Sequence, residues 1–479
     1  MRVLLVDPPY RMTYRPYVIP HMGLAYLAAM LLREKHEVRV VAEGLTKDPY
    51  RDFTRILPDF RPDLIAFSSP TSKIVQAAQM AQTAKELRPE CRTLAGGWHA
   101  SSVPDETARM FPSFDFVFAG EGENFILQLI DALDGRGSLD KIEGLAWRQD
   151  DDVVLNPLPA PLPDIKTLPH PAWELFGIEK SLPMYRKGKV LDYPIVSRRG
   201  CPFHCSFCDT PHVDRRTRLR DLDDFFDELN SALERWPING IQFFDATFTP
   251  PTDFTMALCE RMIAADLPKR LVWNCATRTD QVSYELLALM KKAGCRVIQA
   301  GVETGNEEVS RKINKNIIAS KSLQFVSWCR DLGILTDISF IFGLPYDTRR
   351  TIGETVRFSR QLDPNWVSYF TFVPFPGTPA AMQAERQEAN LRLLHKDYTR
   401  YEKQFLPPCE LRDYSARRLF LRRMLSYAQF YLRPRKLRYL FVMIDPLALP
   451  KVLFNTLAVA ISTALKKRKS KTREEGAIT

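Results

Sequence analysis

Residues 199–208 read RGCPFHCSFC, so that Cys201, Cys205 and Cys208 are separated by three and by two residues. Such spacing lets a single loop hold three corners of a cubane iron–sulfur cluster, because these clusters are bound by cysteine thiolates. No fourth cysteine follows in the loop, and the next one is Cys259. One iron would therefore stay open to a substrate, which favours catalysis over plain electron transfer. A zinc site or a chance grouping of cysteines is the alternative.

A series of strand and helix signals extends outward from this loop to about residue 379. The expected strands are residues 194–197, 240–244, 271–275, 297–301, 336–342 and 366–373. Six strands with intervening helices predict a partial (β/α)6 barrel of the TIM type, which we assign to residues 191–390. The chemistry of such barrels lies at the carboxyl ends of the strands. The loop at 199–208 follows the first expected strand, and this position favours the cluster over the zinc site.

Residues 1–150 carry a second strand–helix series, so the fold class is α/β. The expected strands are residues 3–6, 37–41, 63–68, 92–95 and 114–118, and the expected helices are 23–32 and 73–87. A Rossmann-like parallel sheet with ligands at the carboxyl ends of its strands is predicted. Residues 151–190 are rich in proline and predict an extended linker. Residues 391–479 are predicted to be a helical, basic C-terminal region.

The net charge of +10 is concentrated at the C-terminal end, because residues 411–479 alone carry about +12. A basic segment on a near-neutral body indicates one local contact rather than a nucleic-acid surface, and an anionic membrane face suits it. The apolar run 452–465 is shorter than the roughly 20 residues that a membrane span needs. An interfacial helix is therefore expected. Helix packing with a solvated basic face is the main alternative, and nucleic acid is the least favoured partner.

The N-terminal residues MRVLLVDPPY lack the layout of a signal peptide, so we expect a cytoplasmic protein, peripheral at the inner face of the membrane through its C-terminal tail. In a reducing compartment, clustered cysteines favour metal ligands over disulfides. Five other cysteines stand singly on apolar backgrounds, which favours buried small hydrophobic side chains: Cys259, Cys275, Cys295, Cys329 and Cys409.

The cysteine loop resembles the cluster loop of the radical S-adenosylmethionine (SAM) superfamily. Further resembling segments follow in that family's order at residues 243–248, 273–278, 301–305, 343–345 and 375–379, so the resemblance covers roughly residues 193–380. It implies a 4Fe–4S cluster whose open iron binds SAM and whose electron yields a 5′-deoxyadenosyl radical. It also implies SAM contacts at Phe207, Asp245, Asn274, Arg278 and Glu303. The simpler interpretation is a helix cap or salt bridge for Asp245 and Glu303, and a surface ion pair for Arg278.

Residues 1–150 resemble the cobalamin-binding domain that precedes the radical domain in one branch of this superfamily. The implied cobalamin contacts lie in five strand-end segments and are Tyr10, Ser68, Ser69, Thr71, Gly96, Gly97, Trp98, His99 and Glu121. Small residues at these ends would let the backbone approach a large planar corrin. The Asp-x-His-x-x-Gly pattern that supplies a cobalt ligand in many such domains is missing. Cobalamin bound without a protein histidine ligand is expected, and a domain that has lost the cofactor is the alternative.

The resemblance implies a cobalamin-dependent methyltransferase that acts at an unactivated carbon of a small, hydrophobic or lipid-like substrate. It further implies an electron donor such as flavodoxin or ferredoxin. A second interpretation keeps both cofactors but replaces methyl transfer by cyclisation, rearrangement or oxidation, as in the anaerobic magnesium-protoporphyrin cyclase. A third is a non-catalytic cobalamin or iron–sulfur sensor. No catalytic side chain is assigned.

Overall fold

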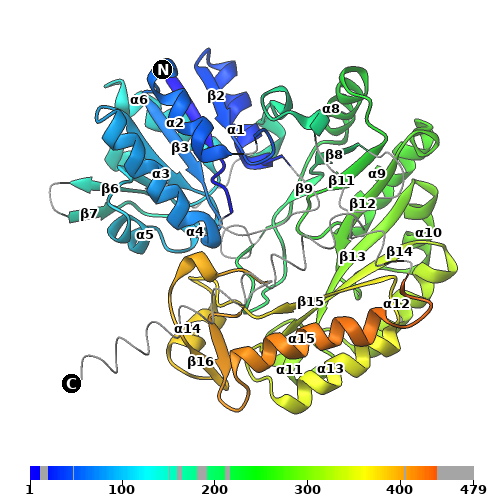
Figure 1. Cartoon of the computed structure of the whole chain (residues 1–479). Coiled ribbons are helices and arrows are strands. Elements are labelled where there is room, and N and C mark those ends of the chain that lie inside the picture. The colour runs from blue at the N-terminus through cyan, green and yellow to red at the C-terminus, as the bar shows by residue number, and fades with distance from the viewer. Residues whose placement is uncertain are drawn as a thin grey trace, which may run out of the picture.

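The structure is a computed structural model that describes residues 1–10, 20–46, 48–149, 152–158, 164–180, 191–210, 216–403, 406–437 and 439. The chain forms two large sheets with helices packed on them, and a C-terminal region that contacts both parts (Figure 1). This arrangement confirms the predicted α/β fold class.

The N-terminal sheet has seven strands in the order β2-β1-β3-β4-β5-β6-β7. The first five strands of this order are parallel, and β6 and β7 complete the edge in antiparallel fashion. The strands are β1 (Arg2–Val6), β2 (Glu37–Val41), β3 (Leu64–Ser68), β4 (Arg92–Gly96), β5 (Phe116–Phe118), β6 (Leu145–Gln149) and β7 (Asp152–Leu155). All five expected strands are present, and β7 extends the sheet slightly past residue 150.

Side chains of β1 alternate between the two faces of this sheet, as strand geometry requires. Val3 and Leu5 join one hydrophobic core, while Leu4 and Val6 join the other. Both faces are covered by helices: α1 (Met22–Arg33), α2 (Pro49–Phe60), α3 (Ile74–Leu87), α4 (Trp98–Ser102), α5 (Pro104–Met110) and α6 (Ile126–Leu133). Short 3-10 turns are η1 (Thr71–Lys73), η2 (Gly122–Asn124) and η3 (Leu139–Lys141).

The described part of the proline-rich segment packs closely against both sheets' cores. It contains the 3-10 turns η4 (Ile165–Thr167), η5 (Trp173–Leu175) and η6 (Ile178–Lys180). The Trp173 side chain is fully buried and makes an edge contact with Tyr193 of the second sheet, and the Ala172 amide donates to the Ala25 carbonyl of α1. This segment therefore contacts both α1 of the first part and β8 (Asp192–Ile195) of the second sheet.

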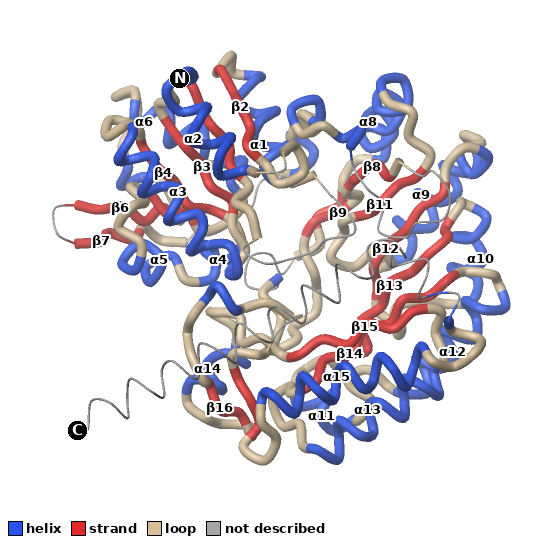
Figure 2. The backbone as a smooth tube through the Cα atoms, viewed as in Figure 1, coloured by secondary structure: helices blue, strands red, loops and turns tan. Residues whose placement is uncertain are grey.

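The second sheet has six parallel strands in the order β15-β14-β13-β12-β11-β8 and curves as an open barrel (Figure 2). The strands are β8 (Asp192–Ile195), β11 (Gly240–Phe243), β12 (Val272–Thr277), β13 (Cys295–Glu303), β14 (Leu335–Phe342) and β15 (Trp366–Thr371). The helices are α8 (Leu222–Arg235), α9 (Thr252–Ala264), α10 (Tyr284–Lys292), α11 (Glu307–Lys312), α12 (Ala319–Asp331), α13 (Arg349–Leu362) and α14 (Pro379–Glu385), with the 3-10 turn η7 (Leu267–Lys269). The predicted six-stranded barrel is confirmed, with strand ends shifted by a few residues.

The C-terminal region begins with a two-stranded ribbon, where the sequence predicted helix. Strand β16 (Leu391–Leu393) pairs with β17 (Cys409–Leu411) in antiparallel fashion, and the turn η8 (Tyr398–Arg400) lies between them. All three residues of β17 are buried, and Cys409 and Leu411 join the hydrophobic core. Helix α15 (Ala416–Tyr431) then packs along the outside of β15 (Figure 1).

No helix within the described ranges is long and apolar enough to cross a membrane. The apolar run 452–465 and the lysines that follow it lie outside the described residues. The five singly placed cysteines are all buried, as predicted from their apolar surroundings.

Candidate active site

The three clustered cysteines follow β8 and lie at the carboxyl edge of the barrel sheet. Their thiols are partly exposed, and burial raises the pKa of each one. The Lys315 ammonium and the Arg278 guanidinium act in the opposite direction and lower the pKa of Cys201 and Cys205. Burial is the larger effect, so the cations offset only part of the rise in pKa.

Backbone bonds hold the cysteine loop against two other segments. The Ser206 amide donates to the Ile313 carbonyl at 2.9 Å, and the Asn314 side chain donates to the His204 carbonyl at 2.8 Å. On the other side, the Ala380 amide donates to the Ser206 carbonyl at 3.0 Å. The loop is therefore fixed by contacts that need no metal.

No three His, Cys, Asp or Glu side chains within the described ranges lie close enough together to hold a single metal ion.

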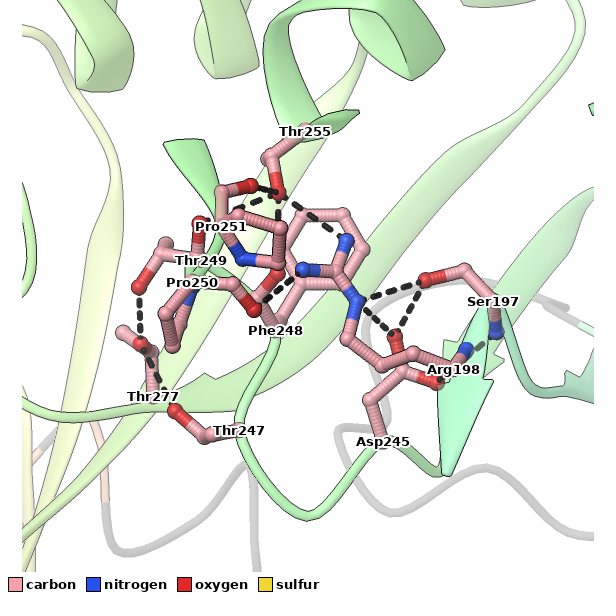
Figure 3. Close-up of polar contacts among 10 residues, drawn as sticks. All are labelled: Ser197, Arg198, Asp245, Thr247, Phe248, Thr249, Pro250, Pro251, Thr255 and Thr277. Carbon is pink, nitrogen blue, oxygen red and sulfur yellow. Dashed lines mark hydrogen bonds and ion pairs between the residues drawn. The ribbon is translucent and has the colours of Figure 1, made fainter. Parts of the chain in front are cut away.

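A buried arginine anchors the strand that leads into the loop (Figure 3). The Arg198 guanidinium is fully buried and donates to the Pro250 carbonyl at 2.7 Å and to the Thr255 hydroxyl at 2.9 Å. The Asp245 carboxylate accepts from the Ser197 amide at 2.8 Å and from the Arg198 amide at 3.2 Å. Desolvation raises the pKa of Asp245 and lowers that of Arg198. The described contacts thus give Asp245 a positioning role beside the cluster loop.

Glu303 lies at the end of β13 with its carboxylate folded back over Gly301. Its backbone φ is +68°, and a Cβ atom at Gly301 would overlap the Glu303 carboxylate and displace it. The Lys315 ammonium donates to Glu303 Oε1 at 3.1 Å, and both side chains are buried. Lys315 had not been predicted from the sequence, because it lies in a loop after α11 with no motif around it. Because Lys315 lies close to Cys205, the Glu303–Lys315 ion pair lies beside the cluster loop.

Arg278 is buried rather than a surface ion-pair residue. It pairs with Asp280 at 2.8 Å and donates to the Lys315 carbonyl at 2.7 Å. Its guanidinium also stacks 4.1 Å from the ring centroid of Phe203, inside the cysteine loop. Arg278 therefore joins the cluster loop to the loop that carries Lys315. Phe207 is partly buried against the hydrophobic core.

Two amide side chains on the inner face of the barrel sheet have unused hydrogen-bonding capacity. Gln242 and Asn274 are register partners on β11 and β12, and each carries a buried amide oxygen that has no partner among the described residues. Their neighbours Ile241, Trp273 and Cys275 face the helix-covered core. Because unsatisfied buried polar groups are costly, these oxygens fit a polar ligand on this face. The sequence predicted Asn274 but missed Gln242, although strand alternation could have identified it.

The predicted cobalamin contacts gather at the carboxyl ends of β3 and β4. Gly97 has φ of +90°, and a Cβ there would meet the Ser69 amide nitrogen at 2.7 Å. The buried His99 Nδ1 lies 3.2 Å from the Thr71 hydroxyl, while His99 Nε2 and the Ser69 hydroxyl have no partner among the described residues. Burial lowers the pKa of His99 to about 3. The glycine turn and the open polar atoms form a cradle that fits a large polar cofactor.

The other predicted cobalamin residues lie around this cradle or beside it. Ser68 is partly buried at the end of β3, Gly96 ends β4, and Trp98 is exposed at the start of α4. Tyr10 stacks on the buried Lys73 ammonium at 4.1 Å. Lys73, which the sequence did not single out, also pairs with Asp7 at 2.7 Å and neighbours Glu43 at 3.6 Å.

An ion-pair network joins the N-terminal domain to the strand that leads into the cysteine loop. Arg199 pairs with Glu121 at 3.0 Å and with Glu123 at 2.7 Å, and Arg218 also pairs with Glu121. The Arg199 guanidinium lies 4.7 Å from the Tyr26 ring centroid. Glu121 thus binds two arginines of the barrel, a contact that its predicted cobalamin role did not include.

The C-terminal region supplies a second contact with the N-terminal domain. The Tyr398 ring makes an edge contact with His99 at 4.8 Å, and its hydroxyl donates to Glu106 at 2.8 Å. Tyr401 packs into the same hydrophobic core. The predicted cofactor cradle is therefore walled partly by residues that come nearly 300 positions later in the sequence.

Two family models match this chain. Residues 195–359 match the Radical SAM superfamily, and residues 11–130 match the B12 binding domain. The chain belongs to the cobalamin-binding branch of the radical SAM superfamily. As a radical SAM enzyme it uses a 4Fe–4S cluster and SAM, and its B12-binding domain adds cobalamin as a cofactor.

Relatives of this radical SAM enzyme are similar over most of its length. An uncharacterized methyltransferase of Pyrococcus horikoshii is 29% identical over 91% of this chain and 94% of its own. The anaerobic magnesium-protoporphyrin IX monomethyl ester cyclase of Rubrivivax gelatinosus is 27% identical over 92% of this chain and 79% of its own. The hopanoid C-3 methylase of Methylococcus capsulatus is 27% identical over 84% of this chain and 75% of its own.

Solved structures share the fold of this radical SAM enzyme. The radical SAM methyltransferase TsrM from Kitasatospora setae, solved with cobalamin and a 4Fe–4S cluster, matches with a TM-score of 0.69 at 20% identity, over 93% of this chain and 91% of that one. The cobalamin-dependent radical enzyme OxsB matches with a TM-score of 0.68 at 17% identity, over 89% of this chain and 66% of that one.

Proposed function

We propose that this enzyme is a cobalamin-dependent radical SAM methyltransferase that methylates an unactivated carbon of a small molecule. The observation that carries the proposal is the direct attachment of the cluster loop to the cobalamin-binding domain. Arg199, two residues before Cys201, is paired with Glu121 and Glu123 of that domain. A methyl transfer of this kind needs both cofactors to reach one substrate, and a rigid link between their sites serves that need.

Each cofactor has a distinct set of residues in this proposal. Cys201, Cys205 and Cys208 hold the cluster, and Asn274, Glu303 and Phe207 bind SAM beside it. Asp245 and Arg278 position the loops around them. When bound, the cluster and SAM supply one-electron cleavage of the sulfonium bond, and cobalamin supplies a carrier for the methyl group.

The residues assigned to SAM suit its amino acid end. Glu303 offers a buried carboxylate for an ammonium group, and Asn274 offers an amide oxygen that lacks a partner among the described residues. Lys315 keeps the pair electrically balanced before SAM arrives, because an unpaired buried carboxylate would be costly. We infer that SAM's ammonium group shares the Glu303 carboxylate with Lys315.

The cobalamin-binding residues are proposed at the cradle of Ser69, Thr71, Gly97 and His99, with Ser68, Gly96, Trp98 and Tyr10 around it. The buried His99 stays neutral at ordinary pH, because its pKa is lowered to about 3. A neutral imidazole whose Nε2 is open can accept or donate one hydrogen bond to the cofactor. Glu121 is proposed to position the domain rather than to contact cobalamin.

Relatives support methyl transfer over the alternatives. Several relatives carry methyltransferase or methylase names. A cyclase of similar sequence identity makes a radical reaction without methyl transfer the second candidate. We also propose a reduced flavodoxin or ferredoxin as electron donor, a hydrophobic substrate, and a cytoplasmic location at the inner membrane face. We also propose the domain limits given by the sequence. They are 1–150 for the cobalamin-binding domain, 151–190 for the linker, 191–390 for the barrel and 391–479 for the C-terminal region.

The test separates these candidates without knowledge of the substrate. The full chain is reconstituted anaerobically with iron, sulfide and cobalamin, then incubated with SAM and a strong reductant. A methyltransferase forms both 5′-deoxyadenosine and S-adenosylhomocysteine, since one SAM is cleaved and another is demethylated. A cyclase-type enzyme forms only 5′-deoxyadenosine, and a sensor forms neither. Either of the last two results overturns the methyl-transfer proposal.

Cysteine variants provide the matched control for this assay. Cys201→Ala, Cys205→Ala and Cys208→Ala should each abolish formation of 5′-deoxyadenosine, because the cluster loses a ligand. Cys329→Ala should retain it, because Cys329 is buried in the core away from the loop.

A further inference from the structure

Helix α15 has a second apolar face that points to solvent. Its inner face packs through Leu419 and Phe430, and the Tyr431 hydroxyl bonds the backbone of β15 at Val367. Its outer face carries apolar side chains that are 43 to 72% exposed, namely Leu421, Met424, Leu425 and the following Leu432. Spacings of three, four and seven residues put these side chains in one stripe along the helix.

Arginines line two adjoining depressions beside this stripe. One depression lies at the start of α13 and is lined by Thr348, Arg349, Arg350, Gly353, Arg357 and Asp413. The other shares Arg349 and is lined also by Tyr414, Arg418, Leu421, Arg422 and Leu425. We call these residues, together with Met424 and Leu432, the α13–α15 surface.

The charge of the α13–α15 surface is largely uncompensated. Arg350 pairs with Glu354 at 2.9 Å, and Asp413 is the carboxylate that lines the surface directly. Among the described residues, Arg349, Arg418 and Arg422 have no carboxylate within salt-bridge distance. An exposed apolar stripe edged by unpaired arginines is the pattern of an interfacial membrane helix, in which guanidinium groups meet phosphates and leucines enter the acyl boundary.

We propose that the α13–α15 surface docks this enzyme on an anionic lipid membrane. A second copy of the chain is disfavoured as the occupant, because a twofold contact would set arginine against arginine. The chain's own segment 440–479 is disfavoured too, because it carries the basic run Lys466-Lys467-Arg468-Lys469. An anionic lipid surface complements both the surface and that segment.

The test is sedimentation of the purified full chain with vesicles of phosphatidylcholine alone or mixed with phosphatidylglycerol. The wild-type chain should bind the anionic vesicles and lose binding in high salt. The double variant Arg418→Glu, Arg422→Glu should weaken the partition coefficient by about 20-fold or more, since each basic residue near such a surface contributes about a fivefold factor. The double variant Leu421→Ser, Leu425→Ser should weaken it by about fivefold or more.

Two further variants locate the contact. Arg55→Glu with Lys269→Glu reverses two exposed charges elsewhere and should leave vesicle binding near wild type. Replacing residues 466–469 by glutamate tests the C-terminal segment separately. Binding that survives both α15 variants but is lost in the 466–469 variant would overturn the proposal, as would failure of the wild type to bind anionic vesicles.

Membrane docking through the α13–α15 surface does not depend on the methyl-transfer reaction. The α15 variants should cleave SAM at the wild-type rate in vesicle-free solution, since none of their residues touches the cofactor sites. Loss of vesicle binding with intact SAM cleavage therefore supports the surface, whereas failed cleavage in the wild type concerns the proposed function alone. An acidic protein partner without lipid binding would also contradict the inference.

Discussion

The Nη2 atom of Arg199 lies 2.7 Å from Oε1 of Glu123, across the contact between the two cofactor domains. Arg199 is two residues from the first cluster cysteine, and Glu123 follows β5 of the cobalamin-binding domain. Both side chains are nearly buried, at 16 and 5% exposure. The distance between the two cofactor sites is thus fixed partly by one ion pair.

Removal of this pair should loosen the domain contact. Arg199→Met leaves two carboxylates, Glu121 and Glu123, buried against Arg218 alone, and loss of one partner of a buried pair costs about 3–5 kcal/mol. We expect a matching fall in the free energy of unfolding by denaturant, and faster loss of cobalamin on gel filtration. Arg33→Met, which removes an exposed pair with Glu34, should change stability by less than about 1 kcal/mol. Equal effects of the two variants would contradict the role of Arg199.

Glu303→Gln should weaken SAM binding while the cluster remains. Charged hydrogen bonds contribute about 1.5–3 kcal/mol, so the Kd for SAM should rise about 10- to 100-fold. Calorimetry with the anaerobic holoenzyme measures this Kd, and the visible absorption of the cluster should match wild type. Glu308→Gln, at an exposed residue paired with Lys312, is the control and should bind SAM normally. Loss of the cluster spectrum in Glu303→Gln would show a structural role instead.

Arg198→Met should destabilise the barrel edge that bears the cluster loop. The fully buried guanidinium is held by Pro250, Thr255 and Asp245, so its removal leaves the Asp245 carboxylate without its cation. We expect a loss of about 3–5 kcal/mol in denaturant unfolding and poor cluster retention. Arg198→Met combined with Asp245→Asn should recover part of the stability, since no buried charge then remains. Without any recovery in the double variant, the charge argument fails.

Gly97→Ala should damage the cobalamin cradle. Its positive φ disfavours any Cβ, and the new methyl group would meet the Ser69 amide nitrogen at 2.7 Å. We expect a loss of about 1–3 kcal/mol in stability and a marked fall in cobalamin bound per chain, measured by absorption after desalting. Gly353→Ala, in helix α13 and outside the cradle, is the control, because its Cβ would meet only Arg357 Nη1 at 3.7 Å. If Gly353→Ala loses as much cobalamin as Gly97→Ala, steric conflict at residue 97 is not the cause.

His99 should make the stability of the protein fall as the pH is lowered. Burial depresses its folded pKa to about 3, so below the ordinary value of 6.5 the unfolded chain takes up a proton that the folded chain rejects. The stabilisation is complete above pH 6.5 and is lost progressively as the pH falls toward 3, at about 1.4 kcal/mol per pH unit. Denaturant unfolding at pH 7 and pH 5.5 should show a steeper loss for wild type than for His99→Gln, by about 1.4 kcal/mol. Parallel slopes for the two proteins would contradict a buried neutral imidazole.

Local patterns predicted the strands and the cluster loop, because each depends on neighbouring residues. The segments 240–244 and 3–6 are short hydrophobic runs of strand length, and RGCPFHCSFC is a contiguous ligand set. The fold class, both sheets and the buried single cysteines followed from such signals. The two-stranded ribbon after residue 391 did not, since its strands are only three residues long and depend on pairing across the loop that carries η8.

Contacts between distant segments could not be predicted from the sequence. Lys315 becomes a partner of Glu303 only because the loop after α11 folds back onto the cysteine loop. Arg199 and Glu123 are 76 positions apart, and each looks like an ordinary surface charge in its own segment. Such pairs depend on how the folded domains pack against each other, and no local sequence pattern encodes that packing.

Two of the contacts between the cobalamin-binding domain and the remainder of the chain, at Arg199 and at Tyr398, have a mechanical consequence. A domain tied at one point can swing about it in any direction, whereas ties at two separated points leave only rotation about the line that joins them. We therefore expect the enzyme to admit its substrate by displacement of loops rather than by parting of its domains. The walls around a reactive intermediate would then keep their spacing through each turnover.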